Sequence, residues 1–259
     1  MKEQLQKDFD NTIKNLTLSQ RDMEIKKFYL DNFINKGFPN RKEEDWKFSD
    51  LNQIIKKNIG ELSFYSDYTS TNKVDTSAFV DGLEHNKIVF INGRIEKIDF
   101  DYEKKDQIEI IDQSETINKF NNNSSLSDLN SAFTNKSFKI VVKEGYQLTK
   151  PLIIYHTTNS KIWSKNINLR LNFELYENSS LRLIDLFRDT SEKNFLNIFY
   201  NFDLKENSIL KNYKVDKFEN KNIKYSFNNI EQDKNSISET FILSSGSNFC
   251  KNEINCNLK

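Results

Sequence analysis

The feature that most constrains the fold of this chain is a ten-residue pattern that returns after about 29 residues. The segment 172–181, Asn-Phe-Glu-Leu-Tyr-Glu-Asn-Ser-Ser-Leu, is followed by 201–210, Asn-Phe-Asp-Leu-Lys-Glu-Asn-Ser-Ile-Leu. A fainter third copy places its Asn-Ser pair at Asn235, 28 residues after Asn207. Each copy consists of an alternating strand, a turn and a second alternating strand. A constant period built from short strands is typical of stacked coils, so we predict a right-handed parallel β-solenoid over residues 136–259.

The repeat also predicts which side chains point into the solenoid, because alternate residues of a strand lie on the same face. The Asn-Ser turns should stack along one corner, where Asn tolerates the left-handed conformation. An antiparallel sandwich with chance similarity is the alternative, but a sandwich does not need a constant spacing. Two inward columns are expected: Phe173, Phe202 and Ile230 in one, and Leu175, Leu204 and the interrupting Gln232 in the other.

Residues 1–135 are predicted to form a small helical N-terminal region with a β-hairpin. Ser19 and Asp22 resemble a capping box that opens a helix ending near Gly37, and a short helix should follow over 50–58. The pair Asn92-Gly93 between apolar runs is a strong hairpin signal. The stretches 66–76 and 114–135 are polar, and the second has room for one short helix. The expected apolar helix positions are Leu5, Phe9, Ile13, Leu16, Met23, Ile25, Phe28, Tyr29 and Phe33.

The charge balance argues against nucleic acid or a membrane as the main partner. The 38 basic and 38 acidic residues cancel, so no overall basic field attracts a polyanion. The chain also contains no apolar run near the ~20 residues of a membrane helix, and its first residues do not form a secretory signal. With only two cysteines no disulfide framework is available, so we expect a soluble cytoplasmic protein.

No catalytic or metal-binding constellation is evident, so we predict a non-enzymatic chain with no cofactor of its own. His85 and His156 each lack a second His or Cys at metal-ligand spacing, and His156 is expected to end the strand 152–155. Cys250 and Cys256 are separated by five residues, which is not a zinc spacing. They are interpreted as ordinary buried thiols, with a contribution to a cluster shared with a partner as the alternative.

The densest local signature is the segment 38–51, Phe-Pro-Asn-Arg-Lys-Glu-Glu-Asp-Trp-Lys-Phe-Ser-Asp-Leu. Trp46 lies beside Arg41 and Lys47, which suggests a cation–π or nucleotide-stacking site. The alternative, which we favour, is a buried Trp46 that fixes the helical segment, with the charges at its rim.

This segment resembles the N-terminal motif of SufD, a member of the SufB/SufD family of β-solenoid subunits in the SUF iron–sulfur assembly scaffold. Further matches are the strand and turn 89–94, the segment 142–152 and the coil 243–258, so the resemblance covers about residues 20–259. The positions that fill the motif in order are Pro39, Arg41, Glu44, Trp46, Lys47, Phe48, Ser49 and Leu51.

The resemblance implies a cytosolic scaffold that pairs with a SufB-like subunit through the solenoids and with a SufC-like ATPase. Sulfur would reach SufB from a cysteine desulfurase, and a nascent iron–sulfur cluster is implied only at the interface with the SufB partner. Arg41, Glu44, Trp46 and Lys47 are carried over as family-motif residues with a structural or interaction role. No catalytic or metal residue is carried over.

The sequence departs from the family in length. Family members continue through more coils and a helical domain that docks SufC. The next Asn-Ser corner is due beyond Lys259, so we expect a fragment that ends in the middle of a coil and self-associates through its open end.

Two other functions remain open. A carbohydrate-binding or carbohydrate-active β-helix usually carries an export signal and clustered charges on one coil face. A SufB-like paralogue that accepts sulfur would need more cysteines along the coils.

Overall fold

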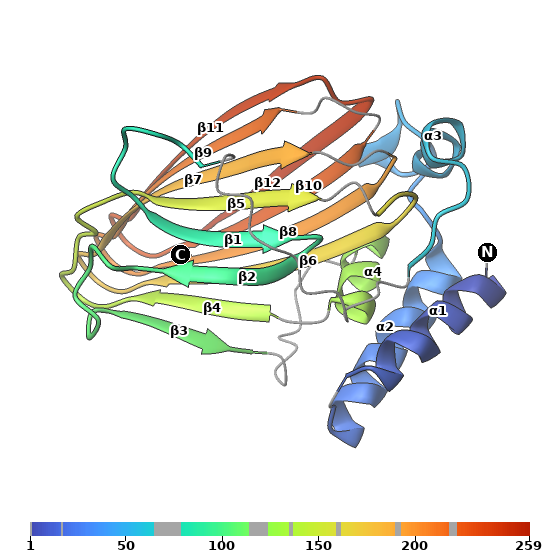
Figure 1. Cartoon of the computed structure of the whole chain (residues 1–259), viewed down its shortest axis with the longest axis horizontal. Helices are drawn as coiled ribbons and strands as arrows, with labels where there is room; N and C mark the ends of the chain where they lie inside the picture. The colour runs from blue at the N-terminus through green and yellow to red at the C-terminus, as the bar shows by residue number, and fades with distance from the viewer. Residues whose placement is uncertain are drawn as a thin grey trace.

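The computed structural model describes residues 2–16, 18–64, 79–113, 124–134, 137–158, 162–189, 193–217 and 222–259 (Figure 1). The predicted polar stretch 66–76 and residues 114–123 of the predicted loop lie outside these ranges. Two facing sheets run side by side, and the helices gather at one end and against one sheet. The helical elements are α1 (Lys2–Lys14), α2 (Gln20–Lys36), η1 (Glu44–Trp46), α3 (Leu51–Asn58) and α4 (Ser125–Phe133).

The strands form a parallel β-solenoid of about four coils, which confirms the predicted fold class. The pairs between coils are parallel, whereas β1–β2 and β3–β4 are antiparallel. Sheet one has the order β11 (Ile237–Ser245), β9 (Ile209–Lys217), β7 (Ser180–Asp189), β5 (Leu152–Thr158), β1 (Asn86–Ile91) and β2 (Arg94–Asp99). Sheet two has the order β12 (Phe249–Leu258), β10 (Ile223–Gln232), β8 (Phe195–Leu204), β6 (Asn166–Leu175), β4 (Ser137–Val142) and β3 (Ile108–Asp112).

The register between coils follows the sequence repeat residue by residue. Asn178, Asn207 and Asn235 occupy the corners with φ angles of 59°, 58° and 58°, which confirms the predicted left-handed turns. The side chain of Asn207 donates to that of Asn178 at 3.3 Å, so the corner forms a ladder of its own. Both predicted inward columns are also present: Phe173, Phe202 and Ile230 are in register, as are Leu175, Leu204 and Gln232.

The predicted hairpin turn is confirmed, and the hairpin is part of the sheets. Asn92 and Gly93 have φ angles of 54° and 79°, as a type I′ turn requires. A Cβ atom on Gly93 would lie 2.6 Å from the side chain of Ile167, so this position also needs a residue without a side chain. β1 pairs in parallel with β5, and the hairpin thereby extends sheet one.

The helices cover the outer face of sheet two rather than forming a separate core. Every residue of α4 is buried, and this helix is the short one for which the predicted loop had room. The amide of Asn130 donates to the backbone oxygens of Leu169 and Asn197 at 3.1 and 2.7 Å. None of the helices in the described ranges combines the length and apolar character needed to cross a lipid bilayer.

The buried face of α2 differs from the predicted apolar stripe. Met23 and Phe28 are exposed, whereas Lys26 is buried and donates to the carbonyl of Thr134 at 2.6 Å, just after α4. Burial, with repulsion from Arg170, lowers the pKa of Lys26 to about 7. The prediction was wrong because carbonyls at the end of α4 solvate an ammonium that sequence periodicity assigns to the surface.

We expect Asn207→Val to destabilise the solenoid by about 1–2 kcal/mol, since a β-branched residue is strained at positive φ. Asn207→Gly is the matched control, because glycine adopts this conformation freely, and it should change the free energy of unfolding by less than about 1 kcal/mol. Urea unfolding followed by circular dichroism measures both. Equal losses in the two variants would show that the side-chain ladder, not the backbone conformation, dominates at the corner.

Candidate functional site

The space between the two sheets, here called the lumen, changes from apolar to polar toward the last coils. One inward column of sheet one reads Phe90, His156, Phe187, Asp216 and Ser244. The facing sheet shows the same change. Its column consists of Ile167, Leu196, Lys224 and Cys250.

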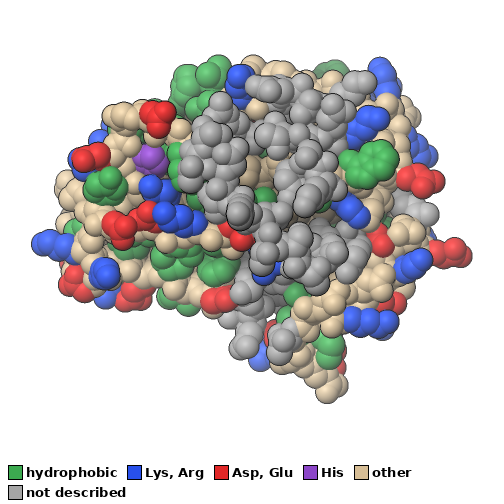
Figure 2. All heavy atoms as spheres, viewed as in Figure 1, with side chains coloured by type: hydrophobic (Ala, Val, Ile, Leu, Met, Phe, Trp, Pro, Cys, Tyr) green, Lys and Arg blue, Asp and Glu red, His purple; other side chains and the backbone are tan. Residues whose placement is uncertain are grey.

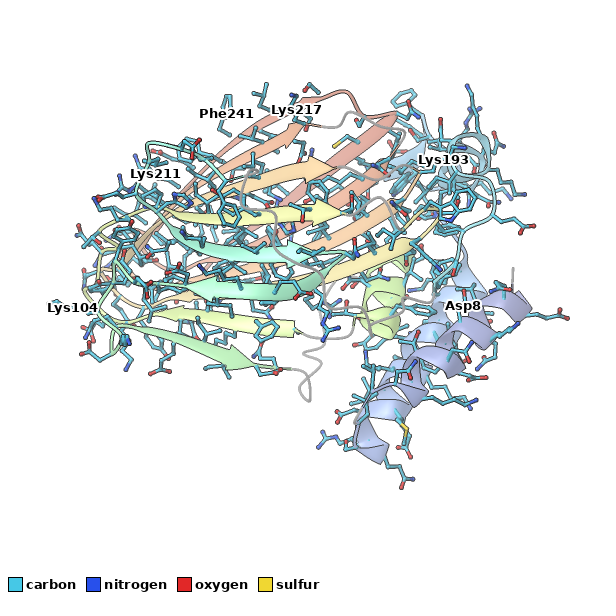
Figure 3. The ribbon with its side chains drawn as sticks, viewed as in Figure 1. Asp8, Lys104, Lys193, Lys211, Lys217 and Phe241 are labelled. Carbon is cyan, nitrogen blue, oxygen red and sulfur yellow. The ribbon has the colours of Figure 1, made fainter. Side chains whose placement is uncertain are left out.

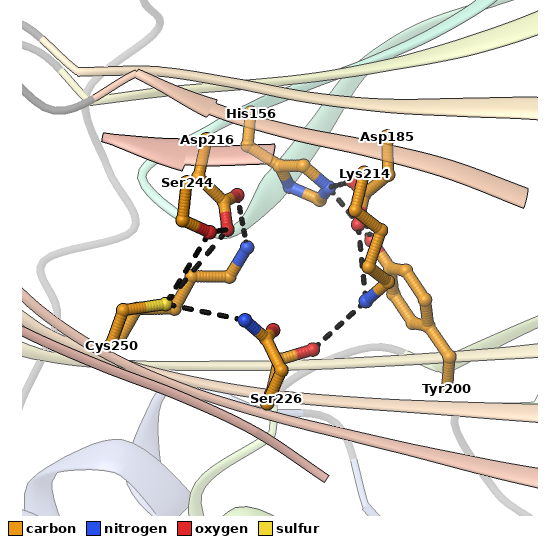
Figure 4. Close-up of polar contacts among 10 residues, drawn as sticks. His156, Asp185, Tyr200, Lys214, Asp216, Ser226, Ser244 and Cys250 are labelled. Carbon is orange, nitrogen blue, oxygen red and sulfur yellow. Dashed lines mark hydrogen bonds and ion pairs between the residues drawn. The ribbon is translucent and has the colours of Figure 1, made fainter. Parts of the chain in front are cut away.

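This polar part of the lumen is the candidate site, and Figure 4 shows it in close-up. Its side chains come from β5 and from β7 to β12, so four successive coils contribute to it. We call it the lumen cluster. Its members are His156, Asp185, Tyr200, Lys214, Asp216, Lys224, Ser226, Ser244, Cys250 and Asn252.

Asp185 is the centre of the first half of the cluster. Its carboxylate lies 2.7 Å from His156 Nε2 and 3.4 Å from Lys214 Nζ, and it accepts a hydrogen bond from the Tyr200 hydroxyl at 3.1 Å (Figure 4). The imidazole of His156 is stacked between the rings of Phe90 and Phe187. These rings fix its orientation, so Nε2 stays directed at the carboxylate.

In this half of the cluster, attraction between opposite charges partly offsets the cost of burying each charge. Burial alone would raise the pKa of Asp185, but His156 and Lys214 outweigh it and hold that pKa well below its usual range. Burial and the negative charge of Asp185 raise the pKa of Tyr200 well above its usual value. Burial lowers the pKa of Lys214 to about 8, since Asp185 only partly compensates and Lys224 repels it. Asp185 is therefore ionised, and Tyr200 keeps its proton.

Asp216 organises the second half of the cluster. Its carboxylate forms an ion pair with Lys224 and accepts from Ser244 at 2.9 Å, and the thiol of Cys250 lies 3.9 Å away. Burial would lower the pKa of Lys224, but Asp216 and Asp185 raise it. Burial raises the pKa of the Cys250 thiol, and Asp216 adds to this rise while Lys224 opposes it. The thiol is therefore protonated and a poor nucleophile near neutral pH.

The arrangement can hold charges and share protons among side chains that are buried in the first three coils and partly exposed in the last one. The buried carboxylates of Asp185 and Asp216 are matched by the ammonium groups of Lys214 and Lys224. Within the described ranges, no group of three or more His, Cys, Asp or Glu side chains is placed to hold a metal ion.

Two sequence-based expectations about chemistry-bearing residues were wrong. His156 lies inside β5 rather than ending it, because its ring faces the lumen and pairs with Asp185 one coil later. Cys256 is exposed rather than buried, since β12 ends its sheet and no described strand pairs with its outer edge, and Cys250 is only partly buried. His85, the other histidine, lies outside the lumen cluster and contacts the Tyr155 hydroxyl at 2.8 Å.

The four charged members of the cluster were missed from the sequence, although a signal for them exists. In β9 the inward positions alternate as Leu210, Asn212, Lys214 and Asp216, once the register is set by the Asn-Ser corner. Applying that register to every strand would have placed these charges inside the solenoid.

The family-motif residue Trp46 is buried, as the favoured interpretation expected, and it packs on the solenoid. Its ring lies 5.8 Å from that of Tyr225 and 6.2 Å from that of Phe249, on the outer face of sheet two. Lys251 Nζ lies 4.8 Å from the Trp46 ring and donates to the Asp45 carbonyl at 2.7 Å. The cation over the ring is thus Lys251, from the last coil, and neither of the two predicted cations.

The other three motif residues lie on the surface. Arg41, Glu44 and Lys47 are exposed, and Lys47 forms an ion pair with Glu44 at 2.7 Å. Sheet two separates the motif from the lumen cluster, because Tyr225 points outward from β10 whereas Lys224 points inward. The structure therefore does not bring the motif and the lumen cluster together in one site.

No family model matches this chain, and no curated protein matches it at a significant level.

We expect the pH dependence of stability to report the burial of Lys214. Its pKa is about 8 in the folded protein, against about 10.5 in an unfolded chain, so the unfolded state binds more protons between these values. The free energy of unfolding of the wild type, relative to Lys214→Met, should therefore rise from pH 8 to 10.5, on the order of 2–3 kcal/mol. Chemical unfolding at several pH values measures this difference.

Lys211→Met is the matched control for this experiment, because Lys211 lies on the same strand with its side chain directed outward (Figure 3). Its difference from the wild type should stay flat over the same range. A flat difference for Lys214→Met as well would contradict the lowered pKa.

Proposed function

We propose that this chain is a cytoplasmic scaffold subunit of the SufB/SufD type in SUF iron–sulfur cluster assembly. The observation that supports this most directly is the combination of a β-solenoid with the Trp46 motif, which packs on the outer face of its last coils. In this role the chain pairs with a SufB-like subunit and with a SufC-like ATPase. It is not itself an enzyme, and the nascent cluster forms at the interface with the SufB-like partner.

The strand edges of the last coil are the surface we assign to the SufB-like partner. β11 and β12 end the strand orders of their sheets, and such edges offer backbone groups to an added strand. β11 also carries exposed apolar side chains. Phe241 and Leu243 are 57% and 53% exposed, and Phe241 points away from the sheet (Figure 3). Figure 2 shows hydrophobic side chains gathered over β11. A second solenoid subunit would continue the ladder and cover these side chains.

The state of Cys250 favours the scaffold over the sulfur-accepting paralogue. A sulfur acceptor needs a thiolate, and burial beside Asp216 raises the pKa of Cys250. Cys256 is exposed, and its thiol donates to the Gln232 side chain at 2.8 Å.

Co-expression with the SufB-like and SufC-like proteins of the same genome, followed by affinity purification of the tagged chain, tests the proposal. We expect both partners to be recovered in a complex that survives gel filtration. Failure to recover either partner would refute the scaffold assignment.

The edge of β12 can be tested by a proline that leaves the internal ladder intact. The N–H of Lys259 donates to Gln232 on β10, so alternation directs the N–H groups of even-numbered residues to the free edge. Ile254→Pro removes one of these free donors and should weaken recovery of the SufB-like partner at least about tenfold. Ile254→Val keeps the donor and is the matched control. Unchanged recovery with Ile254→Pro would move the interface away from this edge.

A further inference from the structure

Facing residues of β9 and β10 form pairs across the lumen of the third coil. Asp216 pairs with Lys224, and Lys214 Nζ donates to Ser226 at 2.9 Å. From the first pair to the second, the position moves two residues back along β9 and two residues forward along β10. The same progression brings Asn212 of β9 opposite Asn228 of β10.

These two asparagines differ from their neighbours because their amides have no partner. Asn212 and Asn228 are each 1% exposed. Within the described ranges, neither the oxygen nor the nitrogen of either amide has a hydrogen-bond partner. Leaving a buried polar group unsatisfied destabilises the folded state, and four such atoms meet in one layer. A folded protein does not sustain that cost when water can reach the site.

The layer is separated from solvent by one partly exposed coil. On its other side, Asn228 is the register neighbour of Tyr200 in the second coil. In the fourth coil the register neighbours of Asn212 and Asn228 are Thr240, which is partly exposed, and Ile254, which is 47% exposed. Solvent therefore approaches the layer from the last coil.

We propose that the Asn212–Asn228 layer is a binding site for ordered water, with at least one molecule bridging the two amides. Water donates to the amide oxygens and accepts from the amide nitrogens, and two to four such partners are what an internal water needs. An apolar guest would leave all four atoms unsatisfied. The neighbouring charges on Lys214 and Asp185 compensate each other, so no bound ion is needed to balance charge at the layer.

The hydrated layer follows from the lumen geometry and is independent of the proposed scaffold role. It places water beside Lys214, and thus connects the buried ion pairs to a proton-exchanging solvent molecule.

Nuclear magnetic resonance of the isotope-labelled 259-residue chain in ordinary water tests the site with water itself as the probe. We expect cross-peaks between water and the side-chain NH₂ groups of Asn212 and Asn228. The nuclear Overhauser effects between water and these protons should have opposite signs in the laboratory frame and in the rotating frame. This sign difference is expected for water whose residence time exceeds the rotational correlation time of the protein. Asn130 is the matched control, because it is equally buried but bonded to protein on both amide atoms, and it should show no such peaks.

Two variants separate bound water from relayed exchange. Ser226→Ala removes one neighbouring exchangeable hydroxyl group and should leave the cross-peaks intact, whereas Asn212→Leu combined with Asn228→Leu should abolish the long-lived water signal in oxygen-17 relaxation dispersion. Absence of cross-peaks at either asparagine in the wild type, or their loss in Ser226→Ala, would overturn the proposal.

Discussion

The fixed register between successive coils is the constraint on which the rest of this structure depends. Each strand from β6 onward pairs in parallel with the strand one coil earlier, so residues about 29 apart stack in columns. Once that register is set, alternation decides which side chains enter the lumen and which face outward. The apolar columns, the asparagine corner and the outer face that receives the helices are all consequences of it. A slip of one residue would exchange the two faces throughout a coil.

The lumen cluster shows what the same register does with charged residues. Burying an ion is costly, and a buried pair often adds little net stability compared with apolar side chains. Here Asp185 from the second coil meets His156 from the first and Lys214 from the third, so each charge is compensated only when three coils are aligned. The cluster thus penalises misaligned stacking more than it rewards correct stacking. This role in specificity explains how ionic groups can persist in an otherwise apolar solenoid.

The sequence allowed the coils to be predicted because their signals are local. Asn207 and its corner, and the columns through Phe173 and Leu175, depend only on a repeat and on alternation. The lumen charges were missed because Lys214 looks like a surface residue until its strand is placed in register. The buried face of α2 was missed because Lys26 is solvated by carbonyls more than 100 residues away. Contacts between residues so far apart in the sequence leave no local pattern. The packing of Trp46 on the last coil is another contact of this kind.

The contact between Asp45 and Lys251 joins residues 206 positions apart. It cannot form until β12 has left the ribosome, although the segment that contains Trp46 is synthesised about 200 residues earlier. While the coils are being synthesised, the indole ring of Trp46 therefore lacks its contacts with the last coil. The helical segment stays incompletely packed until that coil is added. Such late closure of a long-range contact makes folding slow.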